Sequence, residues 1–231
     1  MIISIHQPNY LPWAGFFHKI LHSDIFVIFD DVQLPRGKDF VIRNRIKTQS
    51  GAKWLSVPVK EKSSLKLIQD VEINNDLKWY EKHWNSIQNN YSKTMFFSKY
   101  QNQFHEVWKK KWNFLVDLNL EIIYLIMNIL EIKTKVVRSS ELNIKSTGTD
   151  KILGILEKLN ADEYFTGWGP GSRRYIDGKE DLFEKKGIKI KKQEFICTEY
   201  YQLFGTFIPD LTICDMLFNI GSEQTRKKLY Q

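Results

Sequence analysis

Short apolar runs and longer segments of helical periodicity alternate along the 231 residues of the chain. The apolar runs have the length of strands and end in polar or turn-forming residues. We expect strands at 2–6, 25–29, 54–59, 134–138, 163–166 and 188–195. The longest helical patterns fall in the middle of the chain, where apolar residues recur every three or four positions. This alternation predicts an α/β fold, in which the short strands form one mixed sheet interrupted by a long-helix insertion.

We expect a single α/β domain over residues 1–231, with a helical subdomain at about 76–131. The chain is 42% hydrophobic and long enough to bury a full core. Its most apolar later stretch, 114–130, contains Asp117 and Glu121, which would lack partners in lipid. We therefore expect no membrane span, and the absence of a signal-peptide pattern at the start favours a cytoplasmic protein.

Charge and cysteine content narrow the classes of ligand. Lys and Arg outnumber Asp and Glu by 34 to 27, which gives a formal net charge of +7. Such a balance favours anionic ligands such as nucleotides, nucleotide-sugars, acyl carriers or RNA. Cys197 and Cys214 lie among apolar neighbours and form no CxxC motif, so we expect core thiols and no metal site.

The first apolar run ends abruptly in a polar turn that two prolines constrain. His6, Gln7, Asn9 and Tyr10 follow the run within five residues. In α/β proteins, loops at the carboxyl edge of the sheet hold polar side chains against ligands. The alternative is an ordinary strand-to-helix loop whose His and Asn satisfy local backbone groups.

Two charged clusters follow the second apolar run. Asp30 and Asp31 are consecutive, so their side chains point to opposite sides, and we expect one of them to face the edge cleft. Alternatively, an aspartate at a strand end caps the next turn. Farther on, Arg43, Asn44 and Arg45 present guanidinium groups that match phosphate and carboxylate geometry. They could equally pair with the two aspartates in a structural cluster.

A glycine-rich loop follows the run at 163–166. It contains Gly167, Trp168 and Gly169, with Arg173 a few residues later. Glycines allow backbone amides to approach an anion closely, and a tryptophan offers a stacking surface for a sugar or base. The loop matches neither GxGxxG nor a Walker motif. It is expected to bind a phosphate or sugar, and the alternative is a tight turn with an exposed tryptophan.

Together these motifs resemble the WbqC-like family over essentially the whole chain. The resemblance rests on HQPNYLPW at 6–13, DDVQ at 30–33, RNRIK at 43–47, WLSVPV at 54–59, the Gly167 loop and DMLFNIG at 215–221. The family is associated with bacterial O-antigen and related surface-glycan gene clusters, which implies work on nucleotide-linked or lipid-linked sugars. The chain has Gly167-Trp168-Gly169 where a Ser-Gly pair is expected, which leaves a hydroxyl role in this loop open.

The leading hypothesis is a transferase of surface-polysaccharide (O-antigen-type) biosynthesis. It would put an acyl or aminoacyl group on the amine of a nucleotide-linked amino sugar. His6 would be the general base, because imidazole titrates near neutral pH. Asp31, or failing that Asp30, would orient the imidazole or bind the amine.

The remaining polar residues would bind substrate. Arg43, Arg45, Arg173 and the amides of the glycine loop would hold phosphates, while Gln7 and Asn9 would steady the carbonyl oxygen. The wider substrate-binding set also includes Tyr10, Asn44, Gly167, Trp168 and Gly169.

No tightly bound cofactor is expected. The acyl donor would be coenzyme A or a carrier-protein thioester, which would make an acyl carrier protein a partner. No nucleophile lies near a motif, so direct transfer is favoured. The alternative class is a non-catalytic protein that binds a glycan precursor or RNA. Most aromatic residues follow helical core spacing, which makes nucleic acid the less favoured ligand.

Overall fold

The computed structural model describes residues 1–35, 39–60 and 66–231. The chain forms two compact units whose segments alternate along the sequence. Unit 1 comprises Met1–Gln7, His18–Asp31 and Lys133–Phe195. Unit 2 comprises Pro8–Phe17, Val32–Ile132 and Ile196–Gln231. The chain therefore passes five times from one unit to the other.

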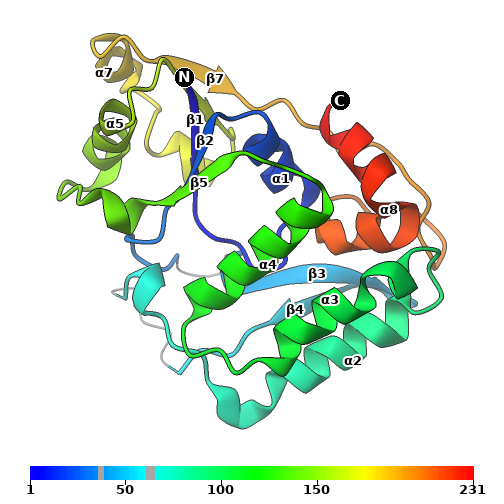
Figure 1. Ribbon diagram of the computed structural model, residues 1–231. Coiled ribbons are helices and arrows are strands. Elements are labelled where there is room, and N and C mark those ends of the chain that lie inside the picture. Colours follow the sequence, from blue (N-terminus) through cyan, green and yellow to red (C-terminus); the bar gives the residue numbers. More distant parts are fainter. Residues whose placement is uncertain (36–38, 61–65) are drawn as a thin grey trace. The chain divides into compact units, whose positions relative to one another are not determined.

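Unit 1 is built on a five-stranded sheet (Figure 1). Its strands are β1 (Ile2–His6), β2 (Ile25–Ile28), β5 (Lys135–Arg138), β6 (Glu163–Thr166) and β7 (Lys189–Lys192). They lie in the order β5-β2-β1-β6-β7, and all four pairings are parallel. Ile3 and Ser4 of the central strand are fully buried, as expected for a parallel sheet that is covered on both faces.

The order in which the chain adds strands to the sheet changes direction at β1. The chain first builds outward from β1 through β2 to β5, then returns to the other side of β1 for β6 and β7. Helix α1 (Ala14–Leu21) precedes β2, whereas α5 (Gly148–Lys158) precedes β6 and α7 (Glu180–Glu184) precedes β7. The carboxyl ends of β1 and β6 therefore flank a topological switch point, which is where doubly wound sheets bind ligands.

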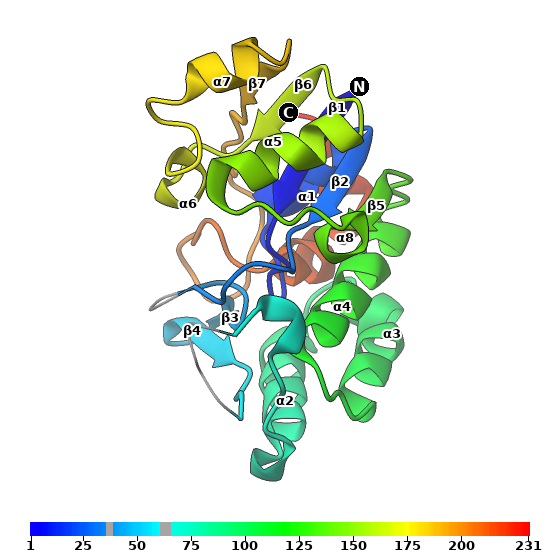
Figure 2. The ribbon, with the colours of Figure 1, turned by 90° about the vertical axis from the view of Figure 1, so that its left-hand side faces the viewer.

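The connecting helices cover opposite faces of this sheet. His18 of α1 contacts the ring of Phe165 on β6, with 5.9 Å between centroids. Phe183 of α7 stacks on the neighbouring Tyr164, also at 5.9 Å. Adjacent strand residues point to opposite faces, so α1 and α7 lie on different sides. Figure 2 shows α5 lying over the strands.

Unit 2 combines helices with a hairpin. Its elements are β3 (Arg43–Thr48), β4 (Gly51–Ser56), α2 (Trp79–Tyr91), α3 (Phe97–Lys109), α4 (Leu115–Ile129) and α8 (Ile213–Leu229). Phe218 of α8 fills the centre of an aromatic core, where its ring lies 5.2–5.3 Å from those of Tyr91, Phe97 and Phe104. Short helical turns complete the two units: η1 (Ile68–Asp70), η2 (Asn75–Leu77), η3 (Ser139–Leu142) and α6 (Pro170–Arg173).

The predicted α/β class is confirmed, and the long helices are inserted between β4 and β5. The strand expected at 54–59 does not join the main sheet, so that sheet has five strands and not six. Residues 51–56 form β4, which pairs antiparallel with β3. β3 was not predicted, because its basic residues indicate a charged cluster and its pattern lacks an apolar run. The strand expected at 188–195 is shorter and ends at Lys192.

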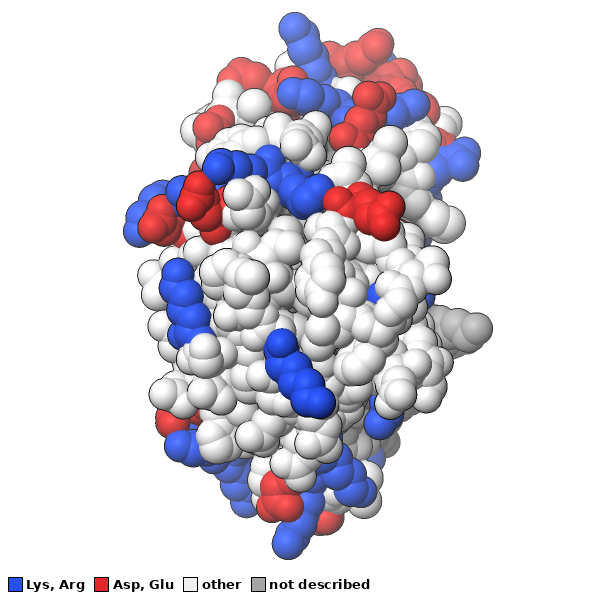
Figure 3. Space-filling model, turned by 90° about the vertical axis from the view of Figure 1, so that its right-hand side faces the viewer, with Lys and Arg blue, Asp and Glu red and all other residues white. Residues whose placement is uncertain are grey.

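The surface shows no wide region of one charge on the face drawn in Figure 3. There, Lys and Arg side chains lie among Asp and Glu side chains, and broad areas carry neither. Within the three described ranges, no helix is both long and apolar enough to cross a membrane.

Candidate functional site

A buried lysine lies at the switch point of unit 1. Lys19 is in α1 and only 3% exposed, and no carboxylate of the described residues forms a salt bridge with it. Burial lowers the pKa of Lys19 to about 7. A lysine whose pKa is lowered in this way can be unprotonated near neutral pH, which suits it to act as a base.

The Lys19 amine lies against the glycine loop. A Cβ atom on Gly167 would lie 3.4 Å from Nζ of Lys19, 3.7 Å from Oγ of Ser172 and 3.8 Å from Oε1 of Gln193. Three polar atoms from three separate segments thus surround the open side of Gly167. Ser172 brings a hydroxyl to this loop, although the motif itself lacks the expected serine.

His6 ends β1 beside the same lysine. Its Nδ1 donates to the backbone carbonyl of Gln7 at 2.8 Å, which leaves Nε2 as the acceptor nitrogen. Burial, and then the positive charge of Lys19, lower the pKa of His6 to about 3. The imidazole is neutral at pH 7 but a weak base. Lys19 is therefore better matched than His6 to accept a proton near neutral pH.

A second imidazole completes this basic cluster. His18 interacts through Nδ1 with the amide nitrogen of Gln193 at 3.0 Å. Burial, together with His22 and Lys19, lowers the pKa of His18 to about 4. The backbone of Gln193 donates to the carbonyl of Thr166 at 2.8 Å, which fixes this residue beside the end of β6. The charge of Lys19 thus contributes to lowering the pKa of both His6 and His18.

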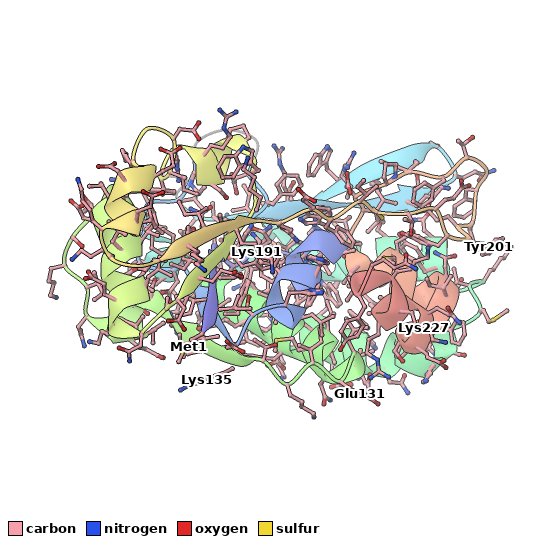
Figure 4. The ribbon with its side chains drawn as sticks, turned by 90° about the horizontal axis from the view of Figure 1, so that it is seen from above. Met1, Glu131, Lys135, Lys191, Tyr201 and Lys227 are labelled. Carbon is pink, nitrogen blue, oxygen red and sulfur yellow. The ribbon has the colours of Figure 1, made fainter. Side chains whose placement is uncertain are left out.

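A cavity of about 800 Å³ lies beside the glycine loop. Trp168, Ile188, Ile190 and Lys192 are among the residues that line it. Nζ of Lys192 sits 3.9 Å from the centre of the Trp168 ring, in a cation–π contact. On the opposite face of β7, Lys191 lies 5.7 Å from the ring of Phe165. Figure 4 labels Lys191 on this strand. The cavity has the size and the mixed lining of a small-molecule site.

The two predicted aspartates form internal contacts. Asp30 is fully buried and accepts hydrogen bonds from Arg138 at 2.6 Å, from Ser139 at 3.2 Å and from the Ser140 hydroxyl at 2.9 Å. It also accepts from the Ser140 backbone amide at 3.0 Å, so it caps η3. Asp31 forms a 2.6 Å salt bridge with Lys151. These contacts match the structural alternative more closely than the orienting role expected for Asp30 and Asp31.

The predicted glycine-loop residues have unequal roles. Gly169 and Gly171 have no atoms within 4 Å of a Cβ position and no left-handed backbone, so neither requires glycine. Of the three glycines in the loop, only Gly167 has side-chain atoms of other residues within 4 Å of its Cβ position. Arg173 pairs with Asp177 at 2.8 Å on the surface, where the pair can exchange for another anion.

Gln7 ends the first segment of unit 1, where it is half-buried. The other predicted residues belong to unit 2, and most of them are buried there. The hydroxyl of Tyr10 lies 2.8 Å from Nδ1 of His83 and accepts from Nε1 of Trp108 at 3.3 Å. Asn44 is fully buried and donates to the carbonyl of Leu11 at 2.6 Å. Asn9 is 5% exposed. Tyr10 and Asn44 are therefore built into the unit 2 core.

The predicted arginines of unit 2 flank a tryptophan. The guanidinium carbons of Arg43 and Arg45 lie 4.6 Å and 5.7 Å from the centre of the Trp54 ring. Trp54 is 41% exposed. Among all predicted residues of this unit, these two arginines are the ones that a soluble anion can best reach.

Lys19 is a candidate functional residue that none of the sequence motifs includes. With 3.6 residues per helical turn, Lys19 falls beside the apolar stripe that contains Phe16, Phe17 and Ile20, and not on it. The periodicity therefore gives no signal that this lysine is buried.

The fold and the site define a doubly wound α/β protein with a basic cluster at its switch point. The chain belongs to the WbqC-like protein family, whose model matches residues 7–227. It is also 30% identical over 223 residues to the uncharacterized protein Rv1507c of Mycobacterium tuberculosis, covering 96% of this chain and 94% of the relative. No solved structure matches the chain significantly.

Proposed function

We propose that this protein is a transferase of surface-polysaccharide biosynthesis that acylates the amine of a nucleotide-linked amino sugar. Family membership and the glycan context it implies support this proposal. The observation that carries it is Lys19, a buried amine with a pKa of about 7 at the switch point of a doubly wound sheet. Acyl transfer to an amine is helped by a base that is unprotonated near pH 7, which for a lysine requires a lowered pKa.

In this proposal the sugar amine attacks the carbonyl carbon of a thioester, and a C–N bond forms. Neutral Nζ of Lys19 takes the proton from the attacking nitrogen. The tetrahedral intermediate then collapses, the C–S bond breaks, and the departing thiolate receives that proton. Neutral His6 and the amide of Gln193 assist by holding polar groups of the substrates, and Ser172 supplies a hydroxyl beside Gly167.

The cavity beside Trp168 is the proposed place for a part of the substrate away from the reacting amine, because neither Lys19 nor His6 lines it. Its lining offers an indole face and aliphatic side chains next to two lysines and to Glu180 and Glu184, whose polar groups can bind the hydroxyls of a sugar ring. The donor is coenzyme A or a carrier-protein thioester, as the sequence suggested.

The test is an acyl-transfer assay with acetyl-coenzyme A and a panel of UDP-linked amino sugars. For the substrate that reacts, Lys19→Ala should lower kcat/KM by about 10²–10⁴-fold, the usual contribution of a general base. Added small amines should partly restore the rate of Lys19→Ala, more so as amine basicity rises. Lys191→Ala removes an exposed lysine from the same unit and is the matched control.

Two results would contradict the proposal. One is full activity in folded Lys19→Ala. The other is binding of a nucleotide-sugar by the wild-type protein with no turnover for any donor, which would support a binding protein without chemistry.

A further inference from the structure

The hairpin of unit 2 carries an exposed aromatic ring between two arginines. Arg43 and Arg45 are two residues apart on β3, so both side chains lie on one face. Trp54 on β4 is the direct cross-strand neighbour of Arg45. The ring of Phe40, which is also 41% exposed, lies 5.8 Å from that of Trp54.

The positive charge of this surface is not neutralised nearby. Among the described residues, no carboxylate forms a salt bridge with Arg43 or Arg45. The Nε atoms of both arginines are buried without a hydrogen-bond partner. Arg45 donates to the backbone carbonyl of Asp210 at 3.2 Å, which holds its guanidinium in place without cancelling its charge.

Lys47 lies on the same face of β3 and, unlike the two arginines, is a buried structural residue. Lys47 is 1% exposed and donates to Gln202 at 3.0 Å and to the carbonyl of Thr206 at 2.6 Å. The segment 202–210 therefore covers Lys47 and satisfies its amine. Arg43 and Trp54 lie beyond that cover and keep their planar groups accessible.

We propose that Arg43, Arg45, Trp54 and Phe40 form a binding surface for a nucleoside diphosphate. The base stacks on the exposed aromatic and guanidinium planes, and the phosphates pair with the free guanidinium edges. The adjoining rings of Trp54 and Phe40 form one aromatic patch, which with two arginines fits one base and one diphosphate, whereas single-stranded RNA needs platforms spaced along the strand. This proposal deepens the transferase function by naming the nucleotide as a recognised group, but its measurement needs no catalysis.

Calorimetric titration of the full chain with UDP, ADP, uridine and inorganic pyrophosphate tests the proposal. A nucleoside diphosphate should bind more tightly than pyrophosphate or uridine. Trp54→Leu should weaken it by about 5–150-fold, the equivalent of 1–3 kcal/mol for a lost stacking contact, while Trp54→Phe retains most of the affinity. Arg43→Gln should weaken both the nucleotide and pyrophosphate.

Two controls separate this surface from general charge effects and from the transferase site. Lys53→Gln removes one charge from the exposed neighbour of Trp54 on the other face of β4, and should leave affinity unchanged. Lys19→Ala should bind the nucleotide normally even if it abolishes turnover, so the two proposals can fail separately.

Several outcomes would overturn the proposal. They are unchanged affinity in folded Trp54→Leu, equal losses in Lys53→Gln and Arg43→Gln, and pyrophosphate binding as tight as that of UDP. Binding of a single-stranded oligonucleotide without any binding of mononucleotides would assign the surface to RNA instead.

Discussion

At the scale of single residues, the burial of Lys19 lowers its pKa and so affects both its reactivity and the stability of the fold. Its pKa of about 7 lies well below the pKa of about 10.4 expected in the unfolded chain. Below pH 7 both states bind the proton, and the folded state carries the full penalty of a buried charge. Above pH 10.4 both states are neutral and the penalty is gone. Lys19 therefore destabilises the fold, and this penalty fades as the pH rises between those values.

This linkage predicts how Lys19→Met changes stability. The variant should be more stable than the wild type at pH 6, and this advantage should shrink by about 2–3 kcal/mol at pH 9. Urea unfolding of both proteins at the two pH values measures the difference. Exposed Lys189 gives the control, since Lys189→Met should show no such pH dependence. A constant difference for Lys19→Met would mean that Lys19 is not buried as a neutral amine.

Single residues also show which parts of the candidate site could be predicted from the sequence. His6 and Gly167 could be assigned to the end of the sheet because each directly follows an apolar run. Lys19 could not be assigned to this place, because it approaches Gly167 only in the folded chain and the two residues are 148 positions apart in the sequence. The predicted base was therefore the imidazole visible in the motif, while the amine with the better-matched pKa comes from a helix that the pattern marks only as core.

At the scale of elements, strand ends were easier to predict than strand partners. The strands of the main sheet could be located from apolar or alternating residues, as in KIKK of β7, but β3 reads RNRIKT and only its pairing with β4 shows that it is a strand. The same limit applies to Asp30. Its position after β2 was evident, but its partners on β5 and η3 follow more than a hundred residues later.

Those partners predict a structural role for Asp30. Asp30→Asn should lower the free energy of unfolding by about 2–4 kcal/mol, because it removes the charge that Arg138 and the η3 amide bind in the interior. Denaturant unfolding measures the loss. Asp177→Asn is the matched control, since its exposed pair with Arg173 should contribute less than about 1 kcal/mol. A folded, equally stable Asp30→Asn protein that has lost acyl transfer would instead restore the catalytic role first expected for this aspartate.

At the scale of the whole molecule, each unit is assembled from three separate stretches of chain. The helices α2 to α4 were expected to form a helical subdomain at about 76–131. In unit 2 their core is completed from outside that range. Phe218 packs among the rings of Tyr91, Phe97 and Phe104, and Asp215 accepts from the Tyr91 hydroxyl at 2.8 Å. Asn119 of α4 donates to the carbonyl of Pro8 at 2.9 Å.

These contacts predict that residues 76–131 alone do not fold cooperatively. Without α8 the fragment exposes the apolar surface that Phe218 covers, and it loses the buried partners of Tyr91 and Asn119. Circular dichroism should show a broad, weak melting transition. The control is a chain that joins 8–17, 32–132 and 196–231 with flexible linkers, which contains all of unit 2 and should melt sharply. A sharp transition for 76–131 at the same temperature as the control would show that the helices form an independent subdomain, and that α8 and the 8–17 segment merely dock onto them.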